Sequence, residues 1–599
     1  MAVPPIQPTR AVAAGPAGLV RVLRATLLPD VVLGLLVAIA LPLAIVAIPN
    51  TISVVAALLP PGVSQIEMIR AHGLALPAMV LTVPVAAVAV RRTRPGLLVV
   101  AGLALVAVAD AAGGYAGTTA VVGALRALHG VGAGLLVPAT LMAVWGRSQA
   151  LRAVWAAALA VSLVAAQALA LWPLDEAESW RVTLQPYPML TGVALVLAAL
   201  HLMFWLKEGE RPGPAPAAGG HRRPLLAAVP AAGIAALALG STFDWPVDRV
   251  VIAALVSVLA LLGLASVGTP GGVAGRAPAY VMLGVGVVLL PTCAQVTYVE
   301  LGGLGGPGLS GLWPAFTIAG AAGLAAAVLS IRLRDVAAPL LAAGGLVAMV
   351  AGLCAVRLFL PAPGGPILIL PFVLLATGAS VALTAGLRSR GEGAALFALS
   401  LLFPAVLAGF LLGSGVQVAR LKEAKTPQAL VDGFVDALHL WTLVGGGLLL
   451  LVIVLGAILA RVPPGTATGE VGAMDDETAA SGPGLEAADI RATGMRASDT
   501  GAAGVVGQGG SVAGAAGWAG PVAGAVGGAG VVPVVPGLAP EAVVPAESRG
   551  TYPRPEQEPP GEPVREPDPD QEKTAVPPVV VPPPTPSPED SPRNGPARP

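Results

Sequence analysis

Fourteen apolar runs, each long enough to form a membrane-crossing helix, occupy most of residues 1–461. They lie near 31–49, 74–90, 97–116, 119–145, 153–172, 188–206, 225–241, 250–268, 279–299, 312–331, 336–360, 366–387, 393–413 and 438–460. A helix needs about 20 mainly apolar residues to cross the hydrocarbon core of a bilayer. With 55% hydrophobic and only 11% charged residues, the chain has too little polar surface for a soluble protein. We therefore expect an all-α integral membrane protein whose partner is the lipid bilayer.

The basic residues between these runs predict the topology. If the amino terminus is cytoplasmic, the connections on the cytoplasmic side hold 14 Lys and Arg residues and the outer connections hold 6. Short cytoplasmic loops of membrane proteins carry the excess of Lys and Arg. We therefore expect a multi-pass protein of the cell membrane with both termini in the cytoplasm. The Ala-, Gly- and Arg-rich, Lys-poor composition indicates a bacterium with a GC-rich genome.

Two segments differ from the apolar runs in composition. Residues 414–437 form the longest predicted outer connection, and their charge pattern suits either two short amphipathic helices or a solvated loop. Residues 462–599 are rich in Gly and Ala and then in Pro and Glu. Such a sequence cannot bury enough side-chain surface to offset its ordering entropy. We expect a disordered cytoplasmic tail, and the sequence does not predict its partner.

One apolar run contains an arginine followed by three glycines at alternate positions. The segment reads RALHGVGAGLLVPATLMAV, with Gly130, Gly132 and Gly134 after Arg126. A phosphate-binding glycine loop follows a strand, and this segment lies within a helix-length apolar run, so that function is excluded. Small residues let membrane helices approach closely, and Pro138 predicts a kink or a local loosening. An arginine inside a span indicates a functional site.

This segment resembles the fourth-span motif of the major facilitator superfamily, Arg-x-x-Gln-Gly-x-Gly-Ala before a run of small residues and proline. His129 stands where the family usually has Gln. LAIVAIP (43–49), SWR (179–181) and TYVELGGLGGPGLSGLWP (297–314) resemble further signatures of the family. Fourteen spans are similar to its drug:proton antiporter branch. The resemblance covers about residues 31–461.

The resemblance implies two six-helix bundles, two extra spans and transport by alternating access at a site near the midplane. Five parts of the chain are then expected. They are a cytoplasmic segment (1–30), the first bundle (31–206), a linker with the two extra helices (207–268), the second bundle (269–461) and the tail (462–599). Arg126 matches the arginine that the family uses in proton coupling.

The chain also departs from the family pattern. The first span lacks the usual carboxylate, and the glycine- and proline-rich end of the fifth span is almost absent. The loop after the second span reads AAVAVRRTRPG, and Arg91 occupies the place of a gating aspartate. Arg91, Arg92 and Arg94 are therefore predicted gating residues.

Proton coupling requires a group that binds and releases a proton near neutral pH. Asp110 is the one carboxylate well within an apolar run, and with Arg126 it forms either a proton relay or a structural ion pair. His129, three residues after Arg126, is either a proton carrier or a histidine bonded to a neighbouring backbone group. Glu300 is expected at the membrane interface, at the end of its span.

Three polar residues inside other spans are candidates for the substrate cavity. Gln167, Thr292 and Gln295 either hydrogen-bond the substrate or hold two helices together. Because this set contains no carboxylate, we expect a neutral or weakly charged substrate rather than a dication.

The sequence predicts a secondary transporter that exports a hydrophobic or amphipathic small molecule, a drug or a secondary metabolite, with protons as the coupling ion. The alternative is a transporter-derived scaffold or sensor that no longer transports. An enzyme is not expected, because no HExxH motif, no embedded Ser/His or paired-Asp arrangement and no metal-ligand cluster is found. No cofactor and no nucleic-acid partner are expected.

Overall fold

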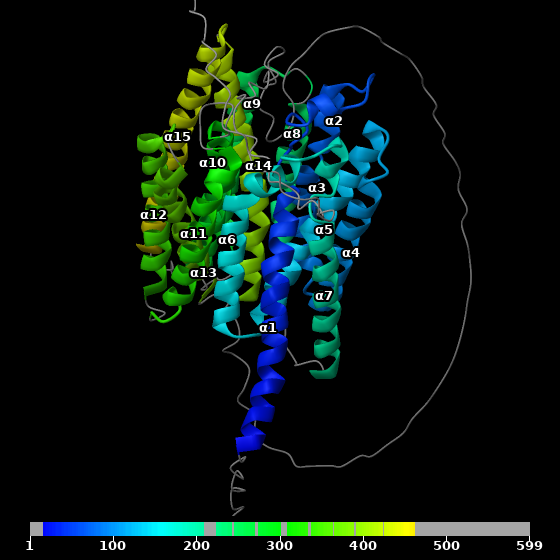
Figure 1. The fold of residues 1–599 in the computed structure, drawn as a ribbon. Coiled ribbons are helices and arrows are strands. Elements are labelled where there is room, and N and C mark those ends of the chain that lie inside the picture. The colour runs from blue at the N-terminus through cyan, green and yellow to red at the C-terminus, as the bar shows by residue number, and fades with distance from the viewer. Residues whose placement is uncertain are drawn as a thin grey trace, which may run out of the picture. The chain divides into compact units, whose positions relative to one another are not determined.

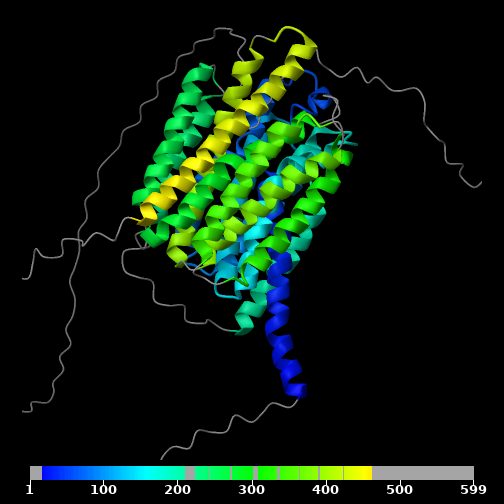
Figure 2. The same ribbon diagram turned by 90° about the vertical axis from the view of Figure 1, so that its left-hand side faces the viewer.

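The computed structural model describes residues 16–461, apart from 209–222, 242, 244, 270–272, 301–307, 334–336, 363–364, 389–390 and 423. The predicted tail, 462–599, lies outside the described residues. The described part is all-α, and its long helices run side by side (Figures 1 and 2). Fourteen of its helical segments are long and apolar enough to cross a membrane, which confirms the predicted number.

The helices fall into three groups along the chain. The first helix set comprises α1 (Pro16–Val46), α2 (Gln65–His72), α3 (Ala75–Ala89), α4 (Pro95–Gly113), α5 (Thr119–Trp145), α6 (Gln149–Leu171) and α7 (Pro188–Glu208). The extra pair is α8 (Ala228–Gly240) and α9 (Val247–Val267). The second helix set comprises α10 (Val273–Val299), α11 (Gly308–Ser330), α12 (Ala338–Phe359), α13 (Ile369–Arg388), α14 (Glu392–Leu421) and α15 (Pro427–Arg461). Short 3₁₀ helices lie at Ala56–Leu58, Trp172–Leu174, Trp180–Leu184, Arg223–Ala227 and Gly365–Leu368.

The two helix sets repeat the same packing. In the first set α5 packs on α3 and α4, α1 packs on α6, and α4 packs on α7. In the second set the corresponding contacts join α13 to α11 and α12, α10 to α14, and α12 to α15. Between the sets, α3 packs on α14, and α6 packs on α10, α11 and α13. α2 and α3 together form one membrane-crossing segment, Gln65–Ala89, so each set has six spans. This agrees with the predicted fold class of two six-helix bundles with two extra spans.

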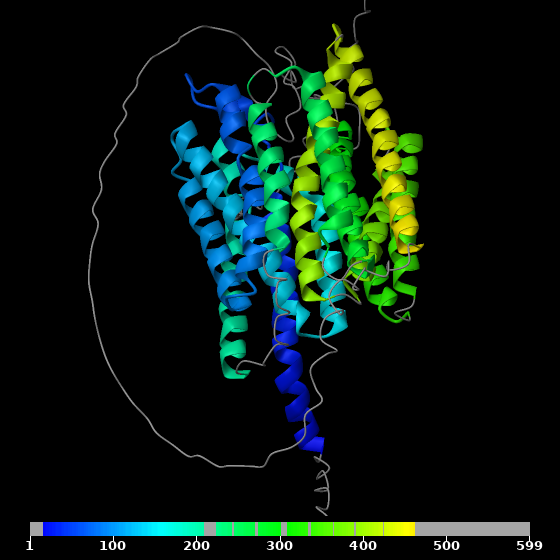
Figure 3. The same cartoon turned by 180° about the vertical axis from the view of Figure 1, so that it is seen from behind.

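The extra helices cover the contact of α3 with α14. α8 packs on α3 and α14, and α9 packs on α14 (Figure 3). The apolar window of α14 is therefore 100% buried, as is that of α10. The extra pair turns the contact of α3 with α14 into an interior surface and leaves the contacts of α6 with α11 and α13 without such a cover.

Glycines allow close helix contacts in both sets. A Cβ atom on Gly132 of α5 would lie 2.8 Å from the Gly102 carbonyl oxygen of α4. In the second set, a Cβ atom on Gly378 of α13 would lie 2.6 Å from the Gly345 carbonyl oxygen of α12. Because small residues permit such an approach of two backbones in a membrane, each set has a glycine contact at the corresponding helix pair.

Two helix ends differ from the prediction. α1 begins at Pro16, inside the predicted amino-terminal segment 1–30. Most of 414–437 continues the membrane helices, because α14 runs to Leu421 and α15 begins at Pro427. The Thr426 hydroxyl accepts a hydrogen bond from the Ala429 N–H at 3.1 Å, and proline suits the first helical position. The predicted separate amphipathic helices or solvated loop are therefore wrong for most of this segment.

Candidate functional site

The glycine segment of α5 lies between α3 and α4. Gly130 and Gly134 face α3, since a Cβ atom on Gly130 would overlap the Ala75 carbonyl and one on Gly134 would lie 2.7 Å from the Thr82 Cβ. Gly132, two residues from each, faces α4. Residues two apart point to nearly opposite sides of a helix, so alternate glycines serve two neighbours. The helix continues through Pro138.

Arg126 is buried and binds backbone carbonyls. Its Nε donates to the carbonyl oxygen of His72, at the end of α2, at 3.1 Å. Its Nη2 donates to the carbonyl oxygen of Ala47, directly after α1. The guanidinium therefore joins α5 to the ends of α1 and α2 while it keeps its positive charge in the interior of the first set.

Asp110, on α4, lies against His129 and Thr191 rather than in a direct ion pair with Arg126. Its Oδ2 accepts a hydrogen bond from the Thr191 hydroxyl on α7 at 2.7 Å. Its Oδ1 lies 3.6 Å from His129 Nδ1 on α5, and this oxygen has no hydrogen-bond partner among the described residues. The carboxylate thus has one oxygen held by a hydroxyl and one facing an imidazole.

These four side chains form a buried polar cluster, which we call the α4–α5 cluster (Asp110, Arg126, His129 and Thr191). Each is at most 4% exposed. Charged groups inside a membrane protein are costly and mark ion or proton pathways. A carboxylic acid next to an imidazole can pass a proton with a small movement of either side chain, because the two atoms are already 3.6 Å apart. The cluster has the chemistry of a proton-binding site.

Two residues in or next to the α4–α5 cluster, Thr191 and His72, were not predicted from the sequence. Thr191 lies in an apolar run, where a single hydroxyl carries no pattern. His72 lies just before the predicted span 74–90; its ring is buried and its Nε2 is 3.4 Å from the Thr183 carbonyl oxygen. In the sequence, the one signal at this position is a histidine directly before an apolar run.

The predicted gating arginines lie at the opposite end of the helices. Arg91 lies beside the first turn of α14, where a Cβ atom on Gly393 would be 3.5 Å from its Nη1. Arg94 lies over the ring of Trp205 on α7 at 4.9 Å, and Arg92 is exposed. Arg91 therefore makes a contact between the two helix sets that would break if this end opened.

The three residues predicted to line the substrate cavity lie at different helix–helix contacts. Thr292 on α10 accepts a hydrogen bond from the Trp441 indole on α15 at 2.9 Å. Gln295 is buried beside Gly413 of α14. Gln167 on α6 lies beside Tyr298 of α10, at a contact between the two sets, and its Nε2 has no hydrogen-bond partner among the described residues. Each of the three therefore lies at a helix–helix contact in this conformation.

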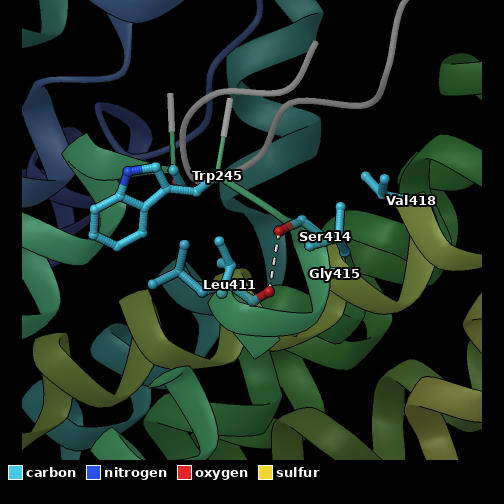
Figure 4. Close-up of a pocket in the computed structure, with 8 residues that line it drawn as sticks. Trp245, Leu411, Ser414, Gly415 and Val418 are labelled. Carbon is cyan, nitrogen blue, oxygen red and sulfur yellow. Dashed lines mark hydrogen bonds between the residues drawn. The ribbon is translucent and has the colours of Figure 1, made fainter. Parts of the chain in front are cut away.

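A pocket of about 30 Å³ lies elsewhere, between α9 and the end of α14 (Figure 4). The Ser414 hydroxyl in its wall donates to the Leu411 carbonyl oxygen at 3.3 Å, and the remaining surface is mostly apolar. Its lining is Ser241, Trp245, Val247, Val250, Leu411, Ser414, Gly415 and Val418. The pocket belongs to the extra pair, and the predicted substrate residues do not line it.

Glu300 follows the last residue of α10 and is fully buried in the protein. Its Oε1 accepts a hydrogen bond from the Ala362 N–H at 2.9 Å, and its Oε2 has no partner among the described residues. Burial raises the pKa of this carboxyl above its ordinary value, and the Ala362 N–H acts in the opposite direction. The protonated form is therefore more favoured in the folded protein than in the unfolded chain.

This burial makes stability pH-dependent. The contribution of Glu300 is fully present below its ordinary pKa of 4.5 and is lost as the pH rises through the raised pKa of the folded state. We expect Glu300→Gln to melt at a higher temperature than wild type at about pH 8 and to lose this advantage toward about pH 4.5. Melting curves across this range check the prediction, with the exposed Glu176→Gln as the control. A difference that does not change with pH would contradict it.

The described residues contain no group of three or more His, Cys, Asp or Glu side chains that could hold a metal ion.

No family profile and no curated protein sequence matches the chain. Among solved structures, the chain is similar to the major facilitator superfamily proton:xylose symporter XylE bound to 6-bromo-6-deoxy-D-glucose. The TM-score is 0.46 at 13% identity, covering 72% of this chain and 95% of that chain.

A second similar structure is a bacterial homologue of the human lysosomal transporter Spinster, in an inward-facing and unoccupied conformation. Its TM-score is 0.42 at 12% identity, covering 72% of this chain and 96% of that chain. No conclusion about the activity of this chain follows from these two likenesses.

Proposed function

We propose that this chain is a secondary transporter of a bacterial cell membrane that exports a hydrophobic or amphipathic small molecule in exchange for protons. The buried contact of Asp110 with His129 carries the proposal. A titratable carboxylate without a full set of partners, at most 4% exposed and beside a histidine, is costly in a membrane protein unless it is used.

The packing of the helices supports alternating access. Two helix sets with the same internal contacts meet through α3 with α14 and through α6 with α10, α11 and α13, so each set can move as a unit about these contacts. The α4–α5 cluster lies within one set. Protonation of Asp110 or His129 changes the charge close to the Arg126 guanidinium. Arg126 is hydrogen-bonded to the ends of α1 and α2. The proton is thereby linked to the position of two helices.

The chemistry of the interior limits the substrate. Gln167, Thr292 and Gln295, the polar groups proposed for the cavity, are uncharged, and Asp110 is engaged with Thr191. An apolar surface with few hydrogen-bonding groups favours a neutral or weakly charged compound, such as a drug or a secondary metabolite.

Transport in proteoliposomes tests the proposal. The full chain is reconstituted, a panel of lipophilic fluorescent compounds is offered, and a pH gradient is imposed. We expect gradient-driven movement of at least one compound, which a K⁺/H⁺-exchanging ionophore abolishes. If all transported compounds move at the same rate with and without the gradient, the result would support a transporter and contradict proton coupling.

The alternative function, a scaffold or sensor that no longer transports, predicts a different result in the same assay. No compound of a broad panel would then move, although the protein is monodisperse and melts cooperatively. Retention of Arg126 with its two backbone bonds and of the three glycine contacts favours the transporter.

A further inference from the structure

A second, smaller cavity lies between α6 and α13, at the helix ends away from the α4–α5 cluster. It has a volume of about 10 Å³, enough for one water-sized group. Its lining is Gln149, Arg152, Ala153, Thr384, Leu387 and Arg388. Since α6 belongs to the first helix set and α13 to the second, the cavity lies at a direct contact between the sets.

The cavity wall offers hydrogen-bond donors and no carboxylate. Thr384 is only 3% exposed, and its hydroxyl has no hydrogen-bond partner among the described residues. Arg152 lies over the Trp145 ring at 5.2 Å, and its buried Nε has no hydrogen-bond partner among the described residues. A guanidinium always carries its charge, so this wall has a cation that lacks a negative counterpart in the cavity.

Two further features add positive potential at the same place. Arg388 donates to the carbonyl oxygens of Ser330 at 2.7 Å and Ile331 at 3.2 Å, which fixes its guanidinium at the end of α13. The first turn of α6 also begins here, with Ser148 as its N-cap. The first backbone N–H groups of a helix lack helical acceptors and carry the positive end of the dipole.

We propose that this cavity binds a phosphate group. One phosphate oxygen enters the cavity between Arg152 and Thr384, and the rest of the group remains at the exposed Gln149. Bidentate and charge-assisted bonds make arginine a preferred partner of phosphate oxygens. The group comes from an anionic phospholipid headgroup or from free phosphate, since the cavity lies at the predicted cytoplasmic end of the helices.

A phosphate at this position would bond to both helix sets at once. Arg152 comes from α6 and Thr384 from α13, so separation of the sets at this end would break the site. The bound anion therefore favours the conformation that is closed toward the cytoplasm. This consequence for transport rests on the proposed function, whereas the binding itself does not.

Melting of the full chain in nanodiscs tests the binding. In one arm the discs hold only phosphatidylcholine and inorganic phosphate is titrated; in the other they hold phosphatidylglycerol and no phosphate is added. We expect a higher melting temperature in at least one arm, which identifies the source. With Arg152→Gln we expect about tenfold weaker binding or a lost shift, because a charge-assisted bond is removed.

Two further variants keep the test decisive. Thr384→Val preserves the side-chain shape and should weaken binding by about threefold, even if Arg152→Gln does not fold. Lys207→Gln removes one positive charge from an exposed position at the same end and should keep the full shift. Equal shifts of wild type, Arg152→Gln and Thr384→Val in both arms, or no shift in either arm, would overturn the proposal. Either result leaves the transport assay unaffected.

Discussion

Asp110→Asn is expected to reduce gradient-driven transport to the level of protein-free vesicles. Asparagine has nearly the same shape and its oxygen can still accept the Thr191 hydrogen bond, which is 2.7 Å long in the wild type. It cannot bind or release a proton at any accessible pH, so the pH gradient loses its point of action. Exchange of the compound across vesicles without a gradient should persist, because the helix contacts are unchanged.

The matched control for this variant is Asp175→Asn, which removes the same charge at an exposed position after α6. It should transport like the wild type. His129→Ala tests the second proton-binding group. Loss of coupling in both Asp110→Asn and His129→Ala would show that the two side chains carry the proton together. Gradient-driven transport by Asp110→Asn at the wild-type rate would contradict the assignment of Asp110.

Gly130→Ala is expected to destabilise the folded protein by about 3 kcal/mol or more, since the added methyl group forces a backbone apart. The new Cβ would overlap the Ala75 carbonyl oxygen and lie 2.9 Å from the Ala78 Cβ. Both atoms belong to α3, which also contacts α14 of the second set. The variant should therefore melt at a lower temperature and also lose transport.

Gly344→Ala is the control for this substitution. Gly344 lies within α12, and a Cβ atom there would have no atom within 4 Å. Alanine has the higher helix propensity, so the stability should stay within about 1 kcal/mol of the wild type. The melting temperatures of the two variants, measured side by side in one detergent, check the comparison. Equal melting of Gly130→Ala and Gly344→Ala would contradict the close contact of α5 with α3.

The number of membrane helices could be predicted because the bilayer fixes the length of an apolar helix. The ends of the helices could not be predicted as well. α14 and α15 extend beyond the apolar runs, since Thr426 and Pro427 start α15 within a mixed segment. Charge and polarity there resembled a loop, whereas the helix start depended on two residues.

The candidate site was predictable in its charged members and not in its partners. Asp110, Arg126 and His129 are unusual inside apolar runs and so attract attention in the sequence alone. Arg126 binds two backbone carbonyls, and a carbonyl has no sequence signature. Thr191 joins Asp110 across 81 residues, a pairing that follows from the packing of α4 on α7.

Infrared difference spectroscopy of the purified protein during acid titration tests the central assignment most directly, because it needs no knowledge of the substrate. A protonated carboxylic acid has a carbonyl band that the ionised form lacks. We expect wild type minus Asp110→Asn to contain one such band that appears on acidification and shifts when Thr191→Val removes the hydrogen bond to Oδ2. Identical titrations of wild type and Asp110→Asn would show that Asp110 does not exchange a proton, and the proton-coupling account would be wrong.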